Sequence, residues 1–137
     1  MANTVTTRYL MKNIPKKEVL LYVTVDSDGT EESDLVVYDS SAVATILGIA
    51  DPLTCTIKDL EVVVMGAAAA RARLEFDANT DVLAAAVPVN GHLKTCYRHF
   101  GGLKNNASTG ITGDILLTTL GLEAGDAVTI LMTVRAD

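Results

Sequence analysis

The chain has 137 residues, a formal net charge of -6 and a hydrophobic fraction of 49%, with only 4% aromatic residues and no Trp. A chain of this length fits one domain with an aliphatic core and needs no disulfide or metal to hold it together. The acidic balance argues against a nucleic-acid partner, because phosphate binding depends on clustered Lys and Arg. We therefore expect a single domain over residues 1–137 that binds no nucleic acid.

The apolar runs are too short to cross a membrane. The longest, such as residues 62–70 with its internal glycine, falls well short of the ~20 residues that span a bilayer. The first ten residues lack a basic region followed by an apolar core, which predicts no signal peptide and synthesis in the cytosol. In that compartment we expect Cys55 and Cys96 to be reduced and packed as small hydrophobic side chains.

The N-terminal third predicts strands with an acidic turn between them. Residues 1–12 mix β-branched and polar side chains and form either an edge strand or an N-terminal arm. Residues 17–26 alternate at period two with apolar side chains on both faces, which indicates a strand that is covered on both sides. The polar, acidic stretch 26–34 predicts a solvated turn before a short strand over 35–38.

One short helix is predicted. Ser40 or Ser41 could cap its N-terminus, and the helix would run through Leu47 to a stop at Gly48. Asp51-Pro52 then breaks the chain.

Residues 53–65 form the longest predicted strand, and the parity of its apolar side chains changes midway. A β-bulge or bend near residues 58–60 explains the change, and such a strand can cross from one sheet to the other. Gly66 and the four alanines after it predict the connection of a hairpin that leads into a strand over 71–76.

Four more strands are predicted in the second half, over residues 82–89, 93–100, 115–120 and 127–134. Asn90-Gly91 is a strong signal for a tight hairpin turn, because a type I′ turn needs positive φ at both central positions. About eight strands with at most one short helix favour an all-β fold. We expect a two-sheet β-sandwich that is jelly-roll-like.

Residues 100–115, FGGLKNNASTGITGDI, form a loop with a specified shape rather than a solvated linker. Its four glycines and two adjacent asparagines reach backbone conformations that most residues avoid. Leu103 and Ile111 should be buried, either against the end of the domain itself or against another subunit.

No catalytic arrangement is visible in the sequence. His92 and Cys96 would share one face of a strand, but His99 would point to the other face, since seven is odd. No phosphate-binding glycine motif or nucleophile turn occurs. We therefore expect a protein that is not an enzyme and uses no cofactor.

Asp77, Asn79 and Asp81 resemble the first positions of a calcium-binding loop. The sixth position of that pattern is not Gly and the twelfth is not Glu, so a polar turn is the favoured interpretation. A weak cation site that also uses Asp114 is left open.

Three blocks of the sequence resemble a group of small virion proteins from tailed bacteriophages. They are FDANTDV at 76–82, FGGLKNNA at 100–107 and TGDI at 112–115, and the opening MANTVT fits as well. The resemblance covers about half of the chain. Two positions depart from the pattern of the group: Phe76 stands where Trp is most common, and Ser108 stands where Gly is common.

This group is similar in kind to head decoration, or cement, proteins, which are compact β domains on the outside of the capsid, often as trimers. The resemblance implies a structural virion protein made in the host cytoplasm and located on the outer surface of the capsid. It also implies the phage major capsid protein as partner and a homotrimer as assembly. The residues expected at such interfaces are Val5, Tyr9, Leu103, Asn105, Asn106 and Ile111.

Two alternatives have the same fold. One is another virion component, such as a tail or fibre-base protein. The other is a carbohydrate-binding jelly-roll module, for which four Tyr, two Phe and no Trp give few aromatic platforms.

Overall fold

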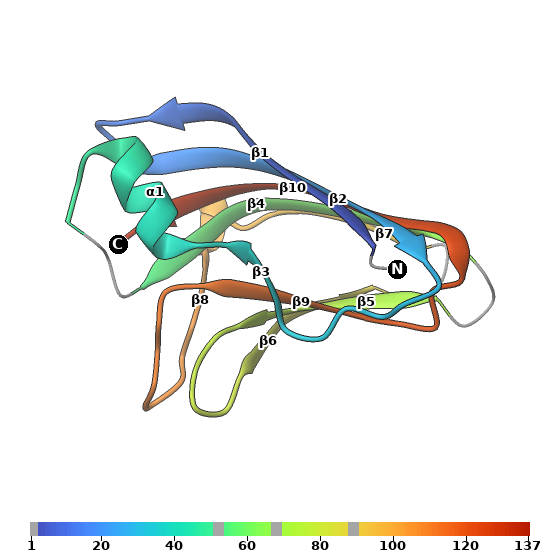
Figure 1. The fold of residues 1–137 in the computed structure, drawn as a ribbon. Helices are drawn as coiled ribbons and strands as arrows, with labels where there is room; N and C mark the ends of the chain where they lie inside the picture. Colours follow the sequence, from blue (N-terminus) through green and yellow to red (C-terminus); the bar gives the residue numbers. More distant parts are fainter. Residues whose placement is uncertain (1–2, 51–53, 67–69, 88–90) are drawn as a thin grey trace.

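The computed structural model describes residues 3–50, 54–66, 70–87 and 91–137, which form two antiparallel sheets packed face to face (Figure 1). The first sheet has the strand order β1-β2-β10-β4-β7, with β8 also paired to β4, and the second has the order β3-β9-β5-β6. The strands are β1 (Thr4–Asn13), β2 (Glu18–Asp28), β3 (Leu35–Tyr38), β4 (Cys55–Met65), β5 (Arg71–Phe76), β6 (Val82–Val87), β7 (His92–Cys96), β8 (Leu103–Lys104), β9 (Ile115–Leu120) and β10 (Ala124–Ala136).

The connection of the strands is that of a jelly roll. When β1 and the two-residue β8 are set aside, the two sheets have the orders β2-β10-β4-β7 and β3-β9-β5-β6. The first of these eight strands therefore lies beside the last, and the second lies beside the last but one. This confirms the predicted two-sheet, jelly-roll-like sandwich. The described total of ten strands exceeds the expected eight because β1 adds an edge strand and β8 adds a short pairing.

One hydrophobic cluster lies between the sheets, and β2 shows how the sequence builds it. Val19, Leu21, Val23 and Val25 alternate along the strand and are each at most 1% exposed. Each such side chain contributes roughly 1.5–3 kcal/mol by leaving water. Both sheets supply side chains of this kind, so the two layers share a single core.

The two cysteines are free, as expected, but only one of them is packed. Cys55 is buried in the core, where burial raises the pKa of its thiol to about 12. Cys96 is exposed at the end of β7, so its predicted role as a packed hydrophobic side chain is wrong.

The predicted bulge in the longest strand is present at Lys58. The pairing of β10 with β4 runs from Thr133 opposite Asp59 to Val134 opposite Ile57, which leaves Lys58 as the extra residue. The predicted crossing to the other sheet is wrong, because β4 pairs with β10 along its whole length. The bulge changes the parity of the side chains without moving the strand out of its sheet.

Two predicted hairpins are wrong for one reason. The strands that flank Gly66 and those that flank Gly91 lie in different sheets, so neither pair shares hydrogen bonds. The alanines at 67–69 and the Asn90 position lie outside the described residues. A turn signal marks a reversal of the chain, but it does not decide whether the strands on either side become partners.

Several boundaries also differ from the predicted ones. The strand expected over 93–100 ends at Cys96 and gives way to a 3-10 helix, η1 (Arg98–Phe100), which ends at Gly101 in a left-handed conformation. β10 begins earlier and ends later than the expected 127–134. Residues 4–13 pair with β2 and form the edge strand, the first of the two alternatives for this segment.

The predicted helix is present as α1 (Ser40–Leu47), but its N-cap is Asp39 and not Ser40 or Ser41. The Asp39 carboxylate accepts hydrogen bonds from the backbone N–H of Ser41 at 3.0 Å and from the Ser41 hydroxyl at 2.7 Å. Gly48 ends the helix with φ +69, as expected. No helix among the described residues is both long and apolar enough to cross a membrane.

Replacement of Asp39 by alanine is expected to lower the free energy of unfolding by about 1 kcal/mol, because the first turn of α1 loses its side-chain acceptor. The hydrogen bond from the Ser41 hydroxyl lowers the pKa of the Asp39 carboxyl. Its stabilising effect is therefore present above the unfolded-state pKa of about 3.9 and is lost as the pH falls through the lower folded-state value.

Denaturation of both proteins across this pH range checks the prediction. The difference between wild type and Asp39→Ala should shrink below about pH 4. The matched control Ser41→Ala should cost less than Asp39→Ala, and an equal or larger cost would contradict the assignment of the cap.

Candidate functional site

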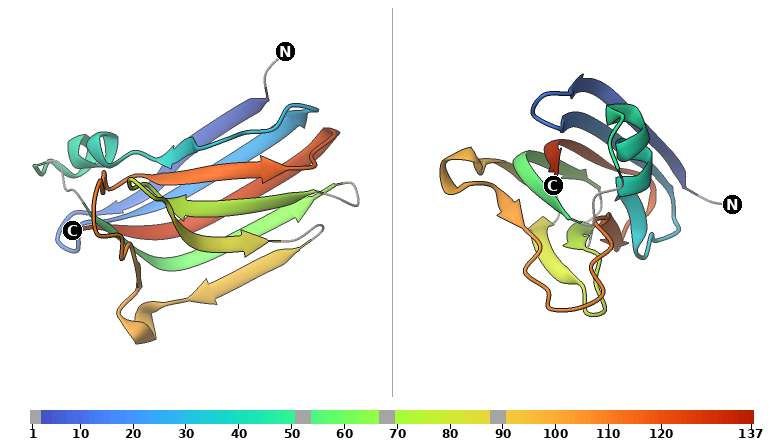
Figure 2. Two further views of the ribbon diagram at one scale, coloured as in Figure 1. Left: turned by 90° about the horizontal axis from the view of Figure 1, so that it is seen from below. Right: turned by 90° about the vertical axis from the view of Figure 1, so that its left-hand side faces the viewer.

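The structured loop predicted from the sequence lies at one end of the sandwich. Residues 101–114 lead from η1 to β9, and the turn between β5 and β6 at residues 77–81 lies next to them. Figure 1 shows both at the end where α1 and the C-terminus also lie, and the two views of Figure 2 agree. We call residues 77–81 together with 98–114 the loop end.

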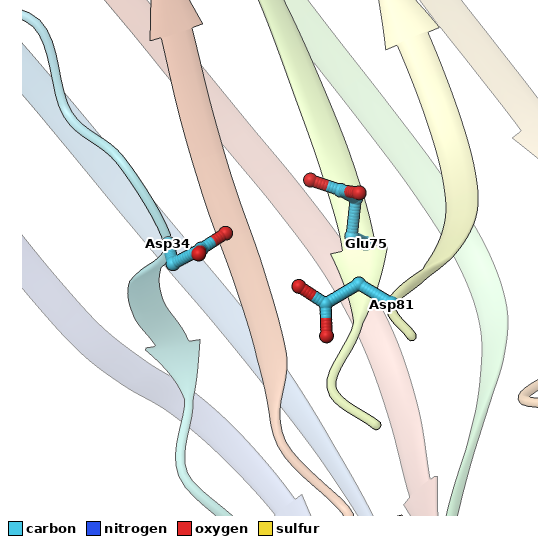
Figure 3. A group of neighbouring side chains, drawn as sticks. All are labelled: Asp34, Glu75 and Asp81. Atoms are coloured by element: carbon cyan, nitrogen blue, oxygen red, sulfur yellow. The ribbon is translucent and has the colours of Figure 1, made fainter. Parts of the chain in front are cut away.

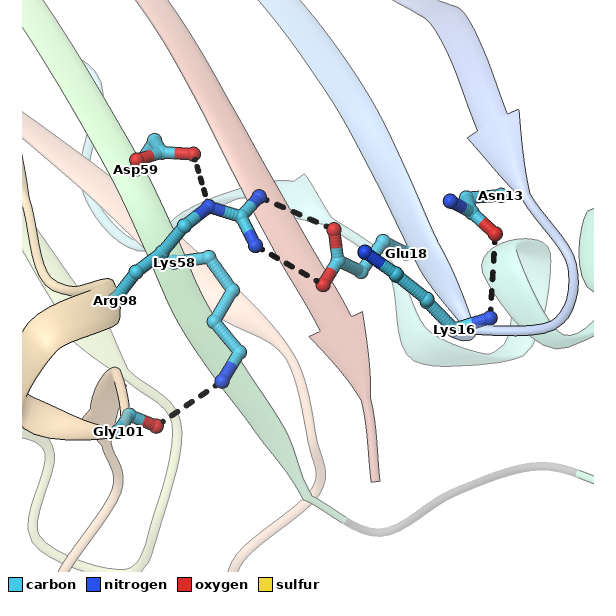
Figure 4. A network of polar contacts seen from close by, with 7 residues as sticks. All are labelled: Asn13, Lys16, Glu18, Lys58, Asp59, Arg98 and Gly101. Carbon is cyan, nitrogen blue, oxygen red and sulfur yellow. Dashed lines mark hydrogen bonds and ion pairs between the residues drawn. The ribbon is translucent and has the colours of Figure 1, made fainter.

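The first part of the loop end is fixed to β4 at its bulge. The Tyr97 N–H donates to the Lys58 carbonyl at 2.8 Å, and the Lys58 amine donates to the Gly101 carbonyl at 3.1 Å (Figure 4). Lys58 is only 8% exposed, so this amine is held inside the fold. Past the bulge, Leu103 and Lys104 pair with β4 as β8. The bulge therefore separates two pairings of the same strand and makes room for η1 between them.

Gly102 is required where the loop touches β4. Its φ is +96, and a Cβ atom there would lie 2.2 Å from Thr56 Cγ2 and 3.2 Å from the Ile57 carbonyl oxygen. Gly101 has φ +80, but a Cβ atom there would meet nothing within 4 Å. Both positions therefore favour glycine for the backbone conformation, and Gly102 is needed for the close approach to β4 as well.

The second part of the loop end is hydrogen-bonded to the β5–β6 turn. The Asn105 amide donates to the Asp77 carbonyl at 3.2 Å, and the Thr112 hydroxyl donates to the Asp77 carboxylate at 2.7 Å. The Asn79 N–H donates to the Thr109 carbonyl at 3.1 Å. Two of the blocks that carry the sequence resemblance, 76–82 and 100–107, therefore meet in space although they are far apart in the chain.

Asp114 connects the loop end to the start of α1. Its carboxylate accepts from the Ser40 N–H at 2.9 Å, and its carbonyl accepts from the Asp77 N–H at 3.1 Å. Burial raises the pKa of Asp114, and the nearby charges of Asp39 and Asp77 add to this effect. The loop is thus fixed to three elements, which limits its conformations before any partner binds.

Phe100 is the most exposed large apolar side chain that the structure describes, at 85%. It stands on η1 next to Arg98, whose guanidinium donates to Asp59 at 3.0 Å and to Glu18 at 3.1 Å (Figure 4). In the end-on view of Figure 2, the segment coloured for these residues stands out at one side of the sandwich. An exposed aromatic ring on a turn that is fixed on both sides loses little conformational entropy when it binds a partner.

The stretch of sequence around Phe100 is basic although the chain is acidic overall. Residues 82–113 contain Lys94, Arg98 and Lys104 and no Asp or Glu. Arg98 is paired with Glu18 and Asp59, so carboxylates from β2 and β4 offset part of this charge in space.

The six predicted interface residues differ in exposure. Val5 and Asn106 are exposed, whereas Tyr9, Leu103, Asn105 and Ile111 are half-buried. Tyr9 and Leu103 pack against the core, so the domain itself buries Leu103. The Asn105 side chain binds inside the loop end, to Asp77 and to the Ala107 N–H. Contact of these six residues with another protein stays a prediction.

Phe100 was missed as a candidate because the alternation of residues 93–100 made it the last residue of a strand. The signal that could have found it is the pair of glycines directly after it, since glycines in the left-handed region end a strand. Phe100 lies in η1, outside the sheet, and is exposed.

One group of three carboxylates among the described residues is close enough to hold a cation. The side-chain oxygens of Asp34, Glu75 and Asp81 lie within 4.8 Å of one another on the outer face of the second sheet (Figure 3). Asp81 therefore lies with Glu75 and not with Asp77, whose carboxylate accepts from Thr112. The arrangement of Asp77, Asn79 and Asp81 around one ion is not the one that this structure forms, and exposed acidic groups are common without an ion.

The histidines are also placed apart. The His92 ring lies 3.1 Å from the Glu61 carboxylate on the outer face of the first sheet, while His99 lies in η1.

Comparisons of this chain with protein-family models, with curated proteins and with solved structures find no match. The loop end fixes an exposed apolar side chain, Phe100, at one end of the sandwich.

Proposed function

We propose that this chain is a structural virion protein, a capsid decoration or cement protein that binds the outer surface of a tailed-phage head and stabilises the capsid. The observation that carries the proposal is the loop end, where Phe100, directly before two glycines with positive φ, is held in an exposed position at 85%. The resemblance of residues 76–82, 100–107 and 112–115 to phage virion proteins supports the same function.

The proposed action is adhesion across the seams between capsid subunits. Phe100 would enter an apolar pocket of the phage major capsid protein. Aromatic anchors of this kind dominate the energy of many interfaces. A standard interface buries about 1,600 Å² in total. Each bound copy therefore adds contacts that must break before internal pressure can rupture the head.

The proposed assembly is a homotrimer. Three linked copies bind with avidity, because the second and third contacts form at high effective concentration once the first is made. The net charge of -6 suits the rest of the surface for contact with solvent outside the shell.

Phage heads that lack the chain are expected to rupture at a lower temperature than complete heads, because the contacts across the seams are missing. Release of DNA from heated particles, followed by dye fluorescence, measures this temperature. Addition of the purified chain to the deficient heads should restore it. Equal rupture temperatures with and without the chain would remove the cement function.

The position of the chain on the particle separates the proposal from a tail or fibre-base protein. Gold-labelled antibodies against the chain should mark the head surface in electron micrographs. Labels confined to the tail would support the alternative virion component.

The carbohydrate-binding alternative has less support. Among the Tyr and Phe side chains, all of which the structure describes, Phe100 alone is exposed, while Tyr38 and Phe76 are buried. A sugar site that relies on stacking usually offers more than one aromatic surface. A glycan array would detect such binding directly.

A further inference from the structure

β6 is an edge strand that carries no charged side chain, although a β-bulge at Ala84 interrupts its pairing with β5. Within the described residues it pairs with β5 on one side and with no strand on the other. Its sequence, VLAAAV, contains no charged residue and no Pro. The edge strands of the first sheet carry Arg8 and Lys12 on β1 and Lys94 on β7, and the second sheet ends on its other side at the four-residue β3. An uncharged edge offers its free backbone groups to another strand.

We propose that two copies of this chain pair antiparallel through β6, so that the four-stranded sheets of both copies join into one continuous sheet. A two-fold axis between Ala84 and Ala85 brings Leu83 of each copy opposite Ala86 of the other. The contact is isologous, with the same surface used by both copies. Side chains and charges on the outer face of the sheet both favour this register.

The first argument is the fit of an exposed side chain to a hollow. Leu83 is 55% exposed on the outer face of the second sheet. A hollow of about 330 Å³ on the same face is lined by Arg71, Ala86, Leu120 and neighbouring residues. In the proposed register, Leu83 of one copy lies beside Ala86 of the other, at the edge of this hollow. Each copy supplies one protruding Leu and one hollow, so two such contacts form.

The second argument is charge. β5 carries Arg71 near one end, and Asp81 lies at the other end, just before β6. Antiparallel pairing places Arg71 of one copy two strands away from Asp81 of the other, a separation of about 10 Å between backbones that two long side chains can close. Arg71 makes no ion pair among the described residues. Asp81 lies in a group of three carboxylates that repel one another and would gain from a cationic side chain (Figure 3).

The contact is expected to be weak by itself. Six paired residues bury less than the about 1,600 Å² of a standard interface. Its effect grows where copies are held close together, as on a shared surface. The inference needs no capsid, however, and its test uses only the purified chain.

The mass of the purified chain in sedimentation equilibrium, over a series of concentrations, tests the pairing. At high concentration, the wild type should reach twice the mass of Ala86→Lys, because a long charged side chain fills the hollow and protects the edge. Ala86 is exposed, so this variant should fold normally. The matched control Thr7→Lys, on the charged edge strand β1, should keep the wild-type mass. Equal masses of wild type and Ala86→Lys at every concentration would overturn the proposal.

A charge exchange tests the register. Arg71→Glu and Asp81→Lys should each halve the mass, and the combined variant should restore it, because the exchanged charges face each other again. Asp81→Asn removes the charge but keeps the oxygen that accepts from the Ala78 N–H. This variant therefore separates the loss of the charge from the loss of the turn. If Ala86→Lys halves the mass but the combined variant does not recover it, the two-fold antiparallel register is overturned.

Discussion

Phe100→Ala is expected to weaken attachment of the chain to capsids by about 30-fold or more, while the free chain keeps its stability. A truncated aromatic anchor at an interface typically costs about 2 kcal/mol or more, which corresponds to this factor. Phe100 is 85% exposed, so the folded chain loses almost no buried surface when the ring is removed. Binding of the labelled variant to heads that lack the chain, measured by co-sedimentation, gives the affinity.

Met65→Ala is the matched control for Phe100→Ala. Met65 is also a large exposed apolar residue, at 63%, but it ends β4 at the opposite end of that strand from the Lys58 bulge. Its removal should leave binding unchanged. If Phe100→Ala binds as tightly as wild type, the loop end does not make the contact.

Gly102→Ala is expected to lower the free energy of unfolding by about 2–6 kcal/mol and to release the loop from β4. A non-glycine residue in the left-handed region costs about 1–3 kcal/mol, and overpacking adds about 1–3 kcal/mol. Both apply, because φ is +96 and a Cβ atom would lie 2.2 Å from Thr56 Cγ2. Urea denaturation measures the change.

Gly101→Ala separates the two effects. Its φ of +80 gives the same kind of backbone strain, but a Cβ atom there has open space around it. It should therefore cost less than Gly102→Ala. Equal losses for the two variants would show that the close approach to β4 does not matter for stability.

The fold was predictable from the sequence where a strand has one buried face. The period-two apolar pattern of residues 19–25 specifies which side chains of β2 enter the core. The change of parity in the long strand predicted a bulge or bend near residues 58–60, and the structure has a bulge at Lys58. Repetition of such strands, with turns between them, was enough to indicate a two-sheet sandwich.

Strand partners were not predictable in the same way. The signals at Gly66 and at Asn90-Gly91 mark reversals of the chain, but in a jelly roll consecutive strands often lie in opposite sheets. The N-cap was also misplaced, because Asp39, Ser40 and Ser41 are all good capping residues and the start of the helix depends on tertiary contacts.

The loop end was predictable as a structured loop, but its contacts were not. Asn105 binds Asp77 across 28 positions of the chain, and no local pattern encodes a contact of that separation. Exposure of Phe100 and burial of Leu103 depend on how β8 returns to β4 after η1. Residue types alone do not show that Phe100 is exposed and Leu103 is half-buried.

The most direct test of an adhesive virion function is the binding of the purified chain to phage heads that lack it. Native mass spectrometry of the chain alone, and of heads before and after its addition, gives both the assembly state and the number of copies bound. The proposal predicts a trimer, or a pair of trimers joined through β6, that binds the outer surface until a fixed ratio to the major capsid protein is reached. Heads whose mass does not change, together with absence of the chain from mature virions, would contradict it.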